Sequence, residues 1–172
     1  MGYQVREARN GDIPGIEAAY FRSWRAAYED FLEPDVLNDQ AERRRRSFDW
    51  SRGMKDPTAA VLVAVDLEGV VLGVAQMNEV LDAPRDLPEI TMLYVDPRAW
   101  GSGIATDLLS AGVDWIADRG HTSARLRVVE DHLRARRFYE REGWAPDLNL
   151  EPAKTELARL IYYRRTVVSS DG

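Results

Sequence analysis

The stretch from residue 90 to residue 119 constrains the fold of this chain most strongly. An apolar run, Ile90–Val95, precedes a turn that contains Pro97, Gly101 and Gly103. The run predicts a strand, and the following residues predict a helix over 101–119 that ends at Gly120. The helix-spaced apolar residues are Ile104, Leu108, Ala111 and Trp115. The turn, VDPRAWGSGIATDLL, is therefore either an ordinary strand-to-helix connection or a backbone cradle for a phosphate.

The other periodic patterns predict a mixed fold. One helix pattern covers Ile13–Tyr28, with Asp12 as its N-cap, and a second covers Pro34–Trp50 and is ended by GMKDPT. A third, short helix lies within DHLRARRFYEREGW, with Asp131 as its N-cap and Gly143 at its end. Strand patterns cover Tyr3–Ala8, Ala59–Asp66, Val70–Asn78, Ala124–Val129 and Leu157–Val168, the second and third joined as a hairpin by LEG. This order predicts a single α+β or mixed α/β domain over residues 1–166, with a short tail over 167–172.

Composition excludes several classes of function. A formal charge of −6 and a pI near 5.0 argue against nucleic-acid binding. The absence of cysteine excludes disulfides, zinc-thiolate sites and a catalytic thiol, and two histidines make no credible metal site. The longest uncharged runs are far below the roughly 20 apolar residues of a membrane span. The opening residues show no signal peptide, so we expect a cytoplasmic protein without a membrane partner.

The glycine turn does not fit the two commonest phosphate-binding motifs. A dinucleotide fingerprint would place Gly or Ala at Thr106, and the G-K-[ST] of a P-loop is absent. At the start of the predicted helix, residues 101–105 still offer backbone N–H groups, with glycines at 101 and 103 and no carboxylate before Asp107. Two interpretations of this turn remain open: a tight turn without a ligand, and a third kind of diphosphate cradle.

Two motifs together resemble the GCN5-related N-acetyltransferase (GNAT) family. EITMLYVDPRAWGSGIATDLL is similar to the family's acetyl-coenzyme A motif, and ARRFYEREGW is similar to its last helix. The glycine and Gly/Ala positions of the first motif fall on Gly103 and Ala105. The family's Gln/Arg falls on Trp100, with Arg98 nearby, and its frequent Asn before the last helix falls on His132. These two departures put the side-chain contacts at those positions in doubt, but most of the cradle is backbone.

The resemblance implies a central, mostly antiparallel, splayed sheet flanked by helices, with acetyl-coenzyme A as co-substrate and no metal. It implies that backbone amides of residues 93–95 polarise the thioester carbonyl. The cofactor-binding residues that it implies are Leu93, Tyr94, Val95, Arg98, Gly101, Ser102, Gly103, Ile104, Ala105, Thr106 and His132.

The resemblance also assigns the proton transfers. Tyr139, in FYEREGW, would protonate the departing thiolate, and an ordinary phenol with a pKa of about 10 is protonated at neutral pH. Glu89 would draw a proton from the amine through a water; a solvated residue at the end of the strand is the equal alternative. Without a cysteine or a nucleophile elbow, direct attack in a ternary complex is the expected mechanism. The alternative function is a module of the same fold that binds or senses acyl-coenzyme A without turnover.

The acceptor leaves few traces in the sequence. Acidic residues gather in two loops that wall the acceptor site in the resembling family: Glu29, Asp30, Glu33, Asp35 and Asp39, and then Asp147, Glu151 and Glu156. They suggest attraction of a cationic amine, of a small molecule or of a peptide N-terminus, or else plain solvated loops. The run Arg43–Arg46 points all round a helix and predicts a solvated face. Arg134, Arg136 and Arg137 could meet the cofactor's ribose phosphate or only the solvent. Family members are often dimers, so a homodimer is possible.

Overall fold

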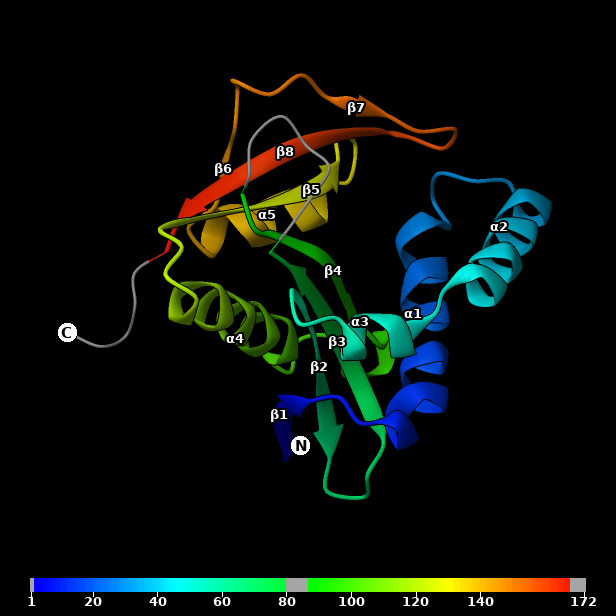
Figure 1. Cartoon of the computed structure of the whole chain (residues 1–172). Helices are drawn as coiled ribbons and strands as arrows, with labels where there is room; N and C mark the ends of the chain where they lie inside the picture. Colours follow the sequence, from blue (N-terminus) through cyan, green and yellow to red (C-terminus); the bar gives the residue numbers. More distant parts are fainter. Residues whose placement is uncertain (1, 80–86, 168–172) are drawn as a thin grey trace. The chain divides into compact units, whose positions relative to one another are not determined.

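The computed structural model describes residues 2–79 and 87–167. Its chain divides into two compact units, one built from the residues up to Gln76 with Met92–Ala111, the other from Met77–Thr91 with the residues from Gly112 on. Eight strands are hydrogen-bonded in the order β1-β2-β3-β4-β5-β8-β6, with β7 on β8 (Figure 1). The sheet is open, mostly antiparallel and flanked by helices, which confirms the predicted fold class. The single domain over 1–166 stays a prediction, and residues 168–172 lie outside the described residues.

The first unit is built on the predicted hairpin. β1 (Tyr3–Glu7) pairs antiparallel with β2 (Ala59–Asp66), which the tight turn at Gly69 joins to β3 (Val71–Asn78). Gly69 has φ +86°, a conformation that costs a residue with a Cβ. The side chain of Asp66 accepts two backbone N–H groups of this turn. β2 and β3 are buried along nearly their whole length, as expected for continuous apolar runs in the middle of a sheet.

Helix α1 (Ile13–Tyr28) has the predicted bounds and one buried stripe. The buried residues recur at three- and four-residue spacing: Ile16, Ala19, Tyr20, Ser23 and Trp24. Asp12 is the N-cap residue of α1, as predicted, but its side chain makes no cap hydrogen bond to this helix. Asp12 also ends the 3₁₀ turn η1 (Asn10–Asp12), where its carboxylate accepts from the backbone of Arg9 and pairs with Arg6 at 2.7 Å.

The predicted helix Pro34–Trp50 is two helices. α2 (Pro34–Ser47) ends where Phe48 becomes extended, and α3 (Trp50–Lys55) begins after the N-cap Asp49, whose side chain accepts from the N–H of Ser51. The Asp-x-Ser signal for a new helix start was present in the sequence. The predicted break in GMKDPT is confirmed, because α3 ends there at Lys55, although Gly53 itself lies inside α3. A Cβ there would come within 3.2 Å of a Val61 methyl, so Gly53 allows α3 to approach β2 closely.

The second unit is built around β8. β8 (Arg159–Thr166) lies along β5 (Ser123–Val129) in an antiparallel register that runs from Ser123–Thr166 to Val129–Leu160 (Figure 1). Two short strands, β6 (Ala145–Pro146) and β7 (Ala153–Lys154), also pair with β8. Helix α5 (Leu133–Arg141) follows β5. Its N-cap is His132 and not the predicted Asp131, because the imidazole accepts from the N–H of Ala135.

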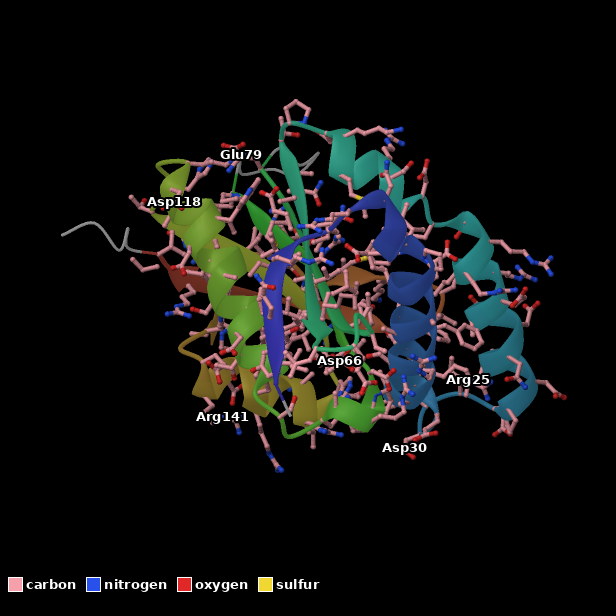
Figure 2. All side chains as sticks on the ribbon, turned by 90° about the horizontal axis from the view of Figure 1, so that it is seen from below. Arg25, Asp30, Asp66, Glu79, Asp118 and Arg141 are labelled. Carbon is pink, nitrogen blue, oxygen red and sulfur yellow. The ribbon has the colours of Figure 1, made fainter. Side chains whose placement is uncertain are left out.

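Helix α4 (Ile104–Asp118) starts three residues later than predicted. Its buried apolar side chains are those of Ile104, Leu108, Leu109, Val113, Ile116 and Ala117, whereas the predicted Ala111 and Trp115 are half-buried. Just beyond its end, Arg119 and His121 both contact Glu79, at 3.4 and 2.8 Å; Glu79 and Asp118 are labelled in Figure 2. No helix in the described residues is long and apolar enough to cross a membrane.

Candidate active site

The glycine turn joins β4 (Glu89–Val95) to α4 in the first unit. After Asp96 the chain makes the 3₁₀ turn η2 (Pro97–Ala99) and then reverses through two left-handed glycines, Gly101 at φ +79° and Gly103 at φ +90°. Both values favour glycine because a Cβ would clash with the backbone. The hydroxyl of Ser102 donates to the carbonyl of Ala99 at 2.6 Å, a hydrogen bond within the turn that stabilises it.

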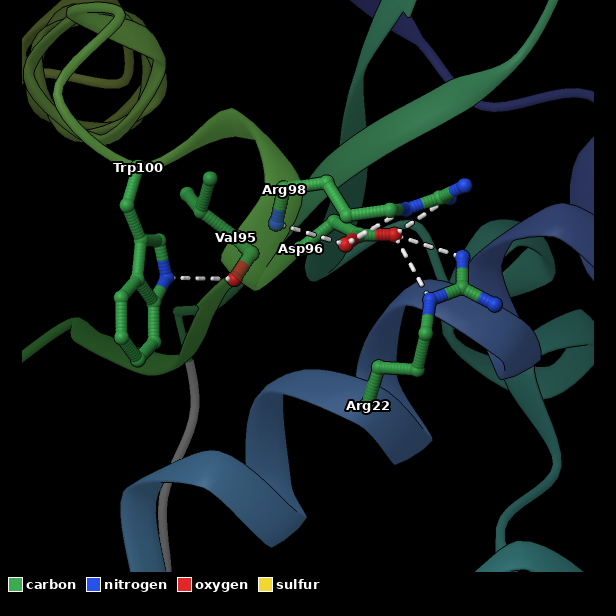
Figure 3. Close-up of polar contacts among 5 residues, drawn as sticks. All are labelled: Arg22, Val95, Asp96, Arg98 and Trp100. Atoms are coloured by element: carbon green, nitrogen blue, oxygen red, sulfur yellow. Dashed lines mark hydrogen bonds and ion pairs between the residues drawn. The ribbon is translucent and has the colours of Figure 1, made fainter.

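A buried carboxylate organises the turn. Asp96 is fully buried and accepts from the backbone N–H and the guanidinium of Arg98, at 2.8–3.1 Å. It also accepts from Nε of Arg22 on α1, at 2.8 Å (Figure 3). Burial alone would raise the pKa of Asp96, but the hydrogen bonds from Arg98 and Arg22 outweigh it and lower the pKa to about 2. Asp96 therefore stays charged and fixes the turn to helix α1.

Trp100, at the Gln/Arg position of the motif, and the nearby Arg98 both contact other residues of the chain. Arg98 holds Asp96 while most of its side chain stays exposed. Trp100 donates its indole N–H to the carbonyl of Val95 at 3.0 Å, and its residue is 40% exposed (Figure 3). An indole without charge thus stabilises the turn from the position where the family has Gln or Arg.

The start of α4 fits an anionic ligand. The first amides of a helix have no carbonyl partner within it, and its dipole favours negative charge there. A Cβ added to Gly101 would meet nothing within 4 Å, whereas one added to Gly103 would meet the Tyr3 hydroxyl at 3.4 Å. That hydroxyl donates to the carboxylate of Asp107 at 2.6 Å, so the acidic residue in the first turn of α4 already has a donor. Backbone donors and open space at this turn suit the diphosphate of acetyl-coenzyme A.

The strand that precedes the turn has a short parallel register. β4 pairs with β5 through Glu89–Arg125 and Ile90–Leu126, and within the described chain this register ends at Ile90. The predicted residues Leu93 and Tyr94 are half-buried, and Val95 is buried. A Cβ at Gly73 of β3 would lie 3.2 Å from the carbonyl oxygen of Tyr94, so a glycine is needed where the two strands approach.

Tyr139 lies on α5 in the second unit. Its ring contacts Phe138 and Tyr163, with centroids 5.2 and 6.4 Å apart. Burial raises the pKa of Tyr139 to about 12, which keeps the phenol protonated at neutral pH. Within the described residues, no group accepts a hydrogen bond from its hydroxyl. The neighbouring Tyr163, by contrast, donates to Glu140 at 2.7 Å.

His132 lies at the start of the same helix. Burial and the charge of Arg134 lower its pKa, so the imidazole is neutral near pH 7. Because Nδ1 accepts from Ala135 at 3.5 Å, a neutral ring carries its proton on Nε2, where it can donate. Of the arginines on this helix, Arg136 donates to the hydroxyl of Tyr163 and to the carbonyl of Glu130, both at 3.1 Å, and so has a structural role.

Glu89 opens β4 but is not solvated. The residue is only 1% exposed, and its two carboxylate oxygens accept from Nε of Arg125 at 2.8 Å and Nε of Arg127 at 2.7 Å. Arg125 is itself buried, whereas the side chain of Arg127 is 40% exposed. The alternative of a solvated strand end is therefore wrong. Sequence reasoning missed these partners because Arg125 and Arg127 come from a strand that is distant in the chain.

The acidic loops are only partly as expected. The first group is exposed, with Asp30 just beyond the end of α1 (Figure 2). In the late loop Glu151 and Glu156 are exposed, but Asp147 is buried and accepts from the backbone and side chain of Asn149. Sequence reasoning also missed Asp96. The Asp-Pro dipeptide after the strand was a turn signal that could have found it.

Comparisons with known proteins agree on one family. A model of the acetyltransferase (GNAT) family matches residues 22–144. An uncharacterized N-acetyltransferase of Bacillus subtilis, YuaI, is 27% identical over 129 residues, covering 74% of this chain and 72% of its own. A mycothiol acetyltransferase of Stackebrandtia nassauensis is 32% identical over 131 residues; the match covers 72% of this chain but only 40% of that enzyme.

Solved structures share the fold. The PaiA N-acetyltransferase of Thermoplasma acidophilum, solved with coenzyme A, superposes with a TM-score of 0.76 at 14% identity, covering 94% of this chain and 98% of that one. A GCN5-related N-acetyltransferase from Kribbella flavida gives a TM-score of 0.68 at 22% identity, covering 96% and 98%. The arrangement of strands and helices is thus common to these proteins at low sequence identity.

Proposed function

The chain belongs to the acetyltransferase (GNAT) family, and from this premise we propose that it transfers the acetyl group of acetyl-coenzyme A to a primary amine. The observation that carries the proposal is the turn from Val95 to Ile104. A buried, charged Asp96 holds this turn. The two left-handed glycines of the turn leave backbone N–H donors at the start of α4. An ordinary connection needs neither the buried carboxylate nor the open glycine.

We assign the cofactor contacts to three groups of residues. The diphosphate is bound by the turn and the first amides of α4, and the side chain of Arg98 can add charge at its edge. The thioester carbonyl is polarised by amides of residues 93–95. His132 donates from Nε2 to a pantetheine carbonyl. The turn residues are Gly101, Ser102, Gly103, Ile104, Ala105 and Thr106.

Acetyl-coenzyme A supplies an activated thioester, and the protein supplies position and protons. The amine nitrogen forms a bond to the carbonyl carbon while the bond from carbon to sulfur breaks. Tyr139 gives its proton to the departing thiolate, and the proton of the amine passes through a water to Glu89. The ion pairs with Arg125 and Arg127 orient this carboxylate, which relays the proton onward.

Release of free thiol tests the proposal directly. The chain has no cysteine, so a thiol reagent reports only on coenzyme A. The purified protein with acetyl-coenzyme A and a panel of primary amines should release thiol in proportion to an acetylated product. Binding of acetyl-coenzyme A without release for any amine would support the non-catalytic module instead. Failure to bind acetyl-coenzyme A would exclude both the acetyltransferase and the non-catalytic binding module.

A further inference from the structure

One arginine of the run Arg43–Arg46 does not face the solvent. Helix α2 buries Leu37 and Ala41, and Arg44 follows three residues later on the same stripe. Its residue is half-buried, whereas its three neighbours in the run are exposed. The expectation of a solvated face is therefore wrong for Arg44, although the helical spacing from Leu37 and Ala41 was visible in the sequence.

The other arginines of the run have carboxylate partners. Arg43 pairs with Asp39 at 2.8 Å, and Arg45 and Arg46 pair with Glu42 at 2.8 and 3.0 Å. For Arg44, no carboxylate of the described residues lies within ion-pair distance. A partly buried cation without a counter-ion is costly, so its charge calls for another source of compensation.

Aromatic side chains surround this guanidinium. Its central carbon lies 5.2 Å from the centroid of the Trp24 ring, which stacks on Tyr28 at 4.6 Å. Burial opposes the charge, but a hydrogen bond with Tyr20 and the nearby phenols of Tyr20, Tyr94 and Tyr28 keep the pKa of Arg44 above its usual value. The guanidinium is therefore a permanent cation in an aromatic environment.

Arg44 and Trp24 each have a buried N–H group without an acceptor in the described residues. Nε of Arg44 and Nε1 of Trp24 are both buried, and neither meets a hydrogen-bond acceptor in the part of the chain that the structure describes. Trp24 is only 1% exposed. Leaving a buried donor unpaired costs about 1–3 kcal/mol, more for a charged group. A cation and a second unpaired donor together select a negatively charged oxygen ligand.

The cluster reaches the strand of the proposed thioester site. The ring of Tyr20 lies 4.7 Å from that of Tyr94, and Tyr94 is the middle residue of the stretch 93–95. All of these residues belong to the first unit. Ring contacts thus connect the surroundings of Arg44 to the stretch 93–95.

We propose that Arg44 and Trp24 bind an oxyanion of the acceptor, so that the acceptor is an amine that also carries a carboxylate or a phosphonate. The proposal rests on the acetyltransferase function above and names its substrate class. The exposed acidic residues beyond α1 would repel a purely anionic molecule, but an ammonium group on the same acceptor offsets that repulsion. The negative group of such an acceptor therefore suits the guanidinium of Arg44, and its ammonium group suits the exposed acidic residues beyond α1.

Matched amine pairs test the proposal. The pairs are lysine with cadaverine, phenylalanine with phenethylamine, and 2-aminoethylphosphonate with ethylamine, each differing by the acidic group. For at least one pair we expect the wild-type protein to acetylate the acidic member with the higher kcat/KM. Arg44→Gln should lower that preference roughly 10- to 100-fold, as for a lost hydrogen bond to a charged group. Trp24→Phe, which keeps a ring, should lower it less.

Arg43→Gln is the matched control, because this neighbour is exposed and already paired with Asp39. It should leave the preference unchanged. Thermal unfolding of each variant with coenzyme A and one member of a pair gives a readout that does not need turnover. Stabilisation by the acidic member that Arg44→Gln abolishes supports the proposal even if no amine is acetylated.

Equal stabilisation and equal rates for both members of every pair would overturn it. A folded Arg44→Gln variant with an unchanged preference for the acidic member would also overturn the proposal. The N–H groups of Arg44 and Trp24 would then donate to an ordered water and not to the acceptor. If amines are acetylated without any preference for an acidic group, the acetyltransferase function stands and only the acceptor class fails.

Discussion

At the scale of single residues, the phenol of Tyr139 is the proposed acid. Tyr139→Phe keeps the ring contacts and removes the acid, so we expect kcat to fall roughly 10²- to 10⁴-fold with little change in acetyl-coenzyme A affinity. Because its pKa is raised to about 12, the wild-type acid stays protonated through pH 10, and this group should cause no alkaline loss of kcat below that pH. Steady-state rates from pH 6 to pH 10 check both points. A Phe variant within threefold of the wild-type kcat would exclude this acid.

Substitution can separate the ion pairs of Glu89 from its proposed role as the base. Glu89→Gln leaves the buried Arg125 without a charged partner, so we expect the free energy of unfolding to fall by about 3–5 kcal/mol. If the carboxylate is also the base, kcat of the folded fraction should fall about 10²-fold or more. Arg127→Gln removes one ion pair and leaves the carboxylate, so its kcat should change far less. Unchanged kcat in folded Glu89→Gln would leave the carboxylate a structural role only.

Asp96 links stability to pH. Its folded-state pKa is lowered from 3.8 to about 2, so it adds stability above pH 3.8 that is lost as the pH falls toward 2. Asp96→Asn should cost about 2 kcal/mol at pH 7, and this difference should shrink between pH 4 and pH 2. Denaturant unfolding across this range measures it. A difference that is constant down to pH 2 would contradict the ion pairs with Arg22 and Arg98.

Asp12→Asn is the matched control for ligand binding. Hydrogen bonding to Arg6 also lowers the pKa of Asp12, but this residue lies at the start of α1 and not in the glycine turn. We expect both variants to lose stability and only Asp96→Asn to bind acetyl-coenzyme A more weakly.

At the scale of elements, the glycine turn is where backbone conformation and binding meet. Gly103→Ala forces a Cβ onto φ +90° and should cost about 1–2 kcal/mol of stability. It should also weaken acetyl-coenzyme A binding, because the start of α4 shifts. Gly69→Ala in the hairpin turn, at φ +86°, carries the same strain away from the proposed cradle. Titration calorimetry on both variants should show weaker binding for Gly103→Ala alone; equal affinities would mean that the turn does not hold the ligand.

The sequence predicted most elements because their signals are local. The two apolar runs of the hairpin, the glycine turn and the stripe of α1 depend on neighbours in the chain, and the structure confirms them. The boundaries of α2, α3 and α5 were wrong where a side chain competes for backbone N–H groups, as Asp49 and His132 do. The contacts of Glu89 and Arg44 could not be predicted from spacing alone, because their partners lie on elements that are brought together only by the fold.

At the scale of the whole molecule, the site residues divide between the two units. The residues assigned to the cofactor, from Leu93 to Thr106, belong to the first, and Tyr139, Glu89 and His132 belong to the second. β4 contributes to both, with Glu89 at its first residue and the amides of 93–95 at its last. A ligand that binds the folded chain and not the unfolded chain stabilises the folded state.

Thermal unfolding with and without acetyl-coenzyme A tests the central claim most directly, with ATP and NADH as controls. A ligand at 100 times its Kd adds about 2.7 kcal/mol, and each kcal/mol raises the Tm of a chain of this size by roughly 2–4 °C. The account predicts an increase of several degrees with acetyl-coenzyme A that neither control reproduces. No increase, or the same increase with ATP and NADH, would mean that the glycine turn is not a cradle for acetyl-coenzyme A and would contradict the proposed function.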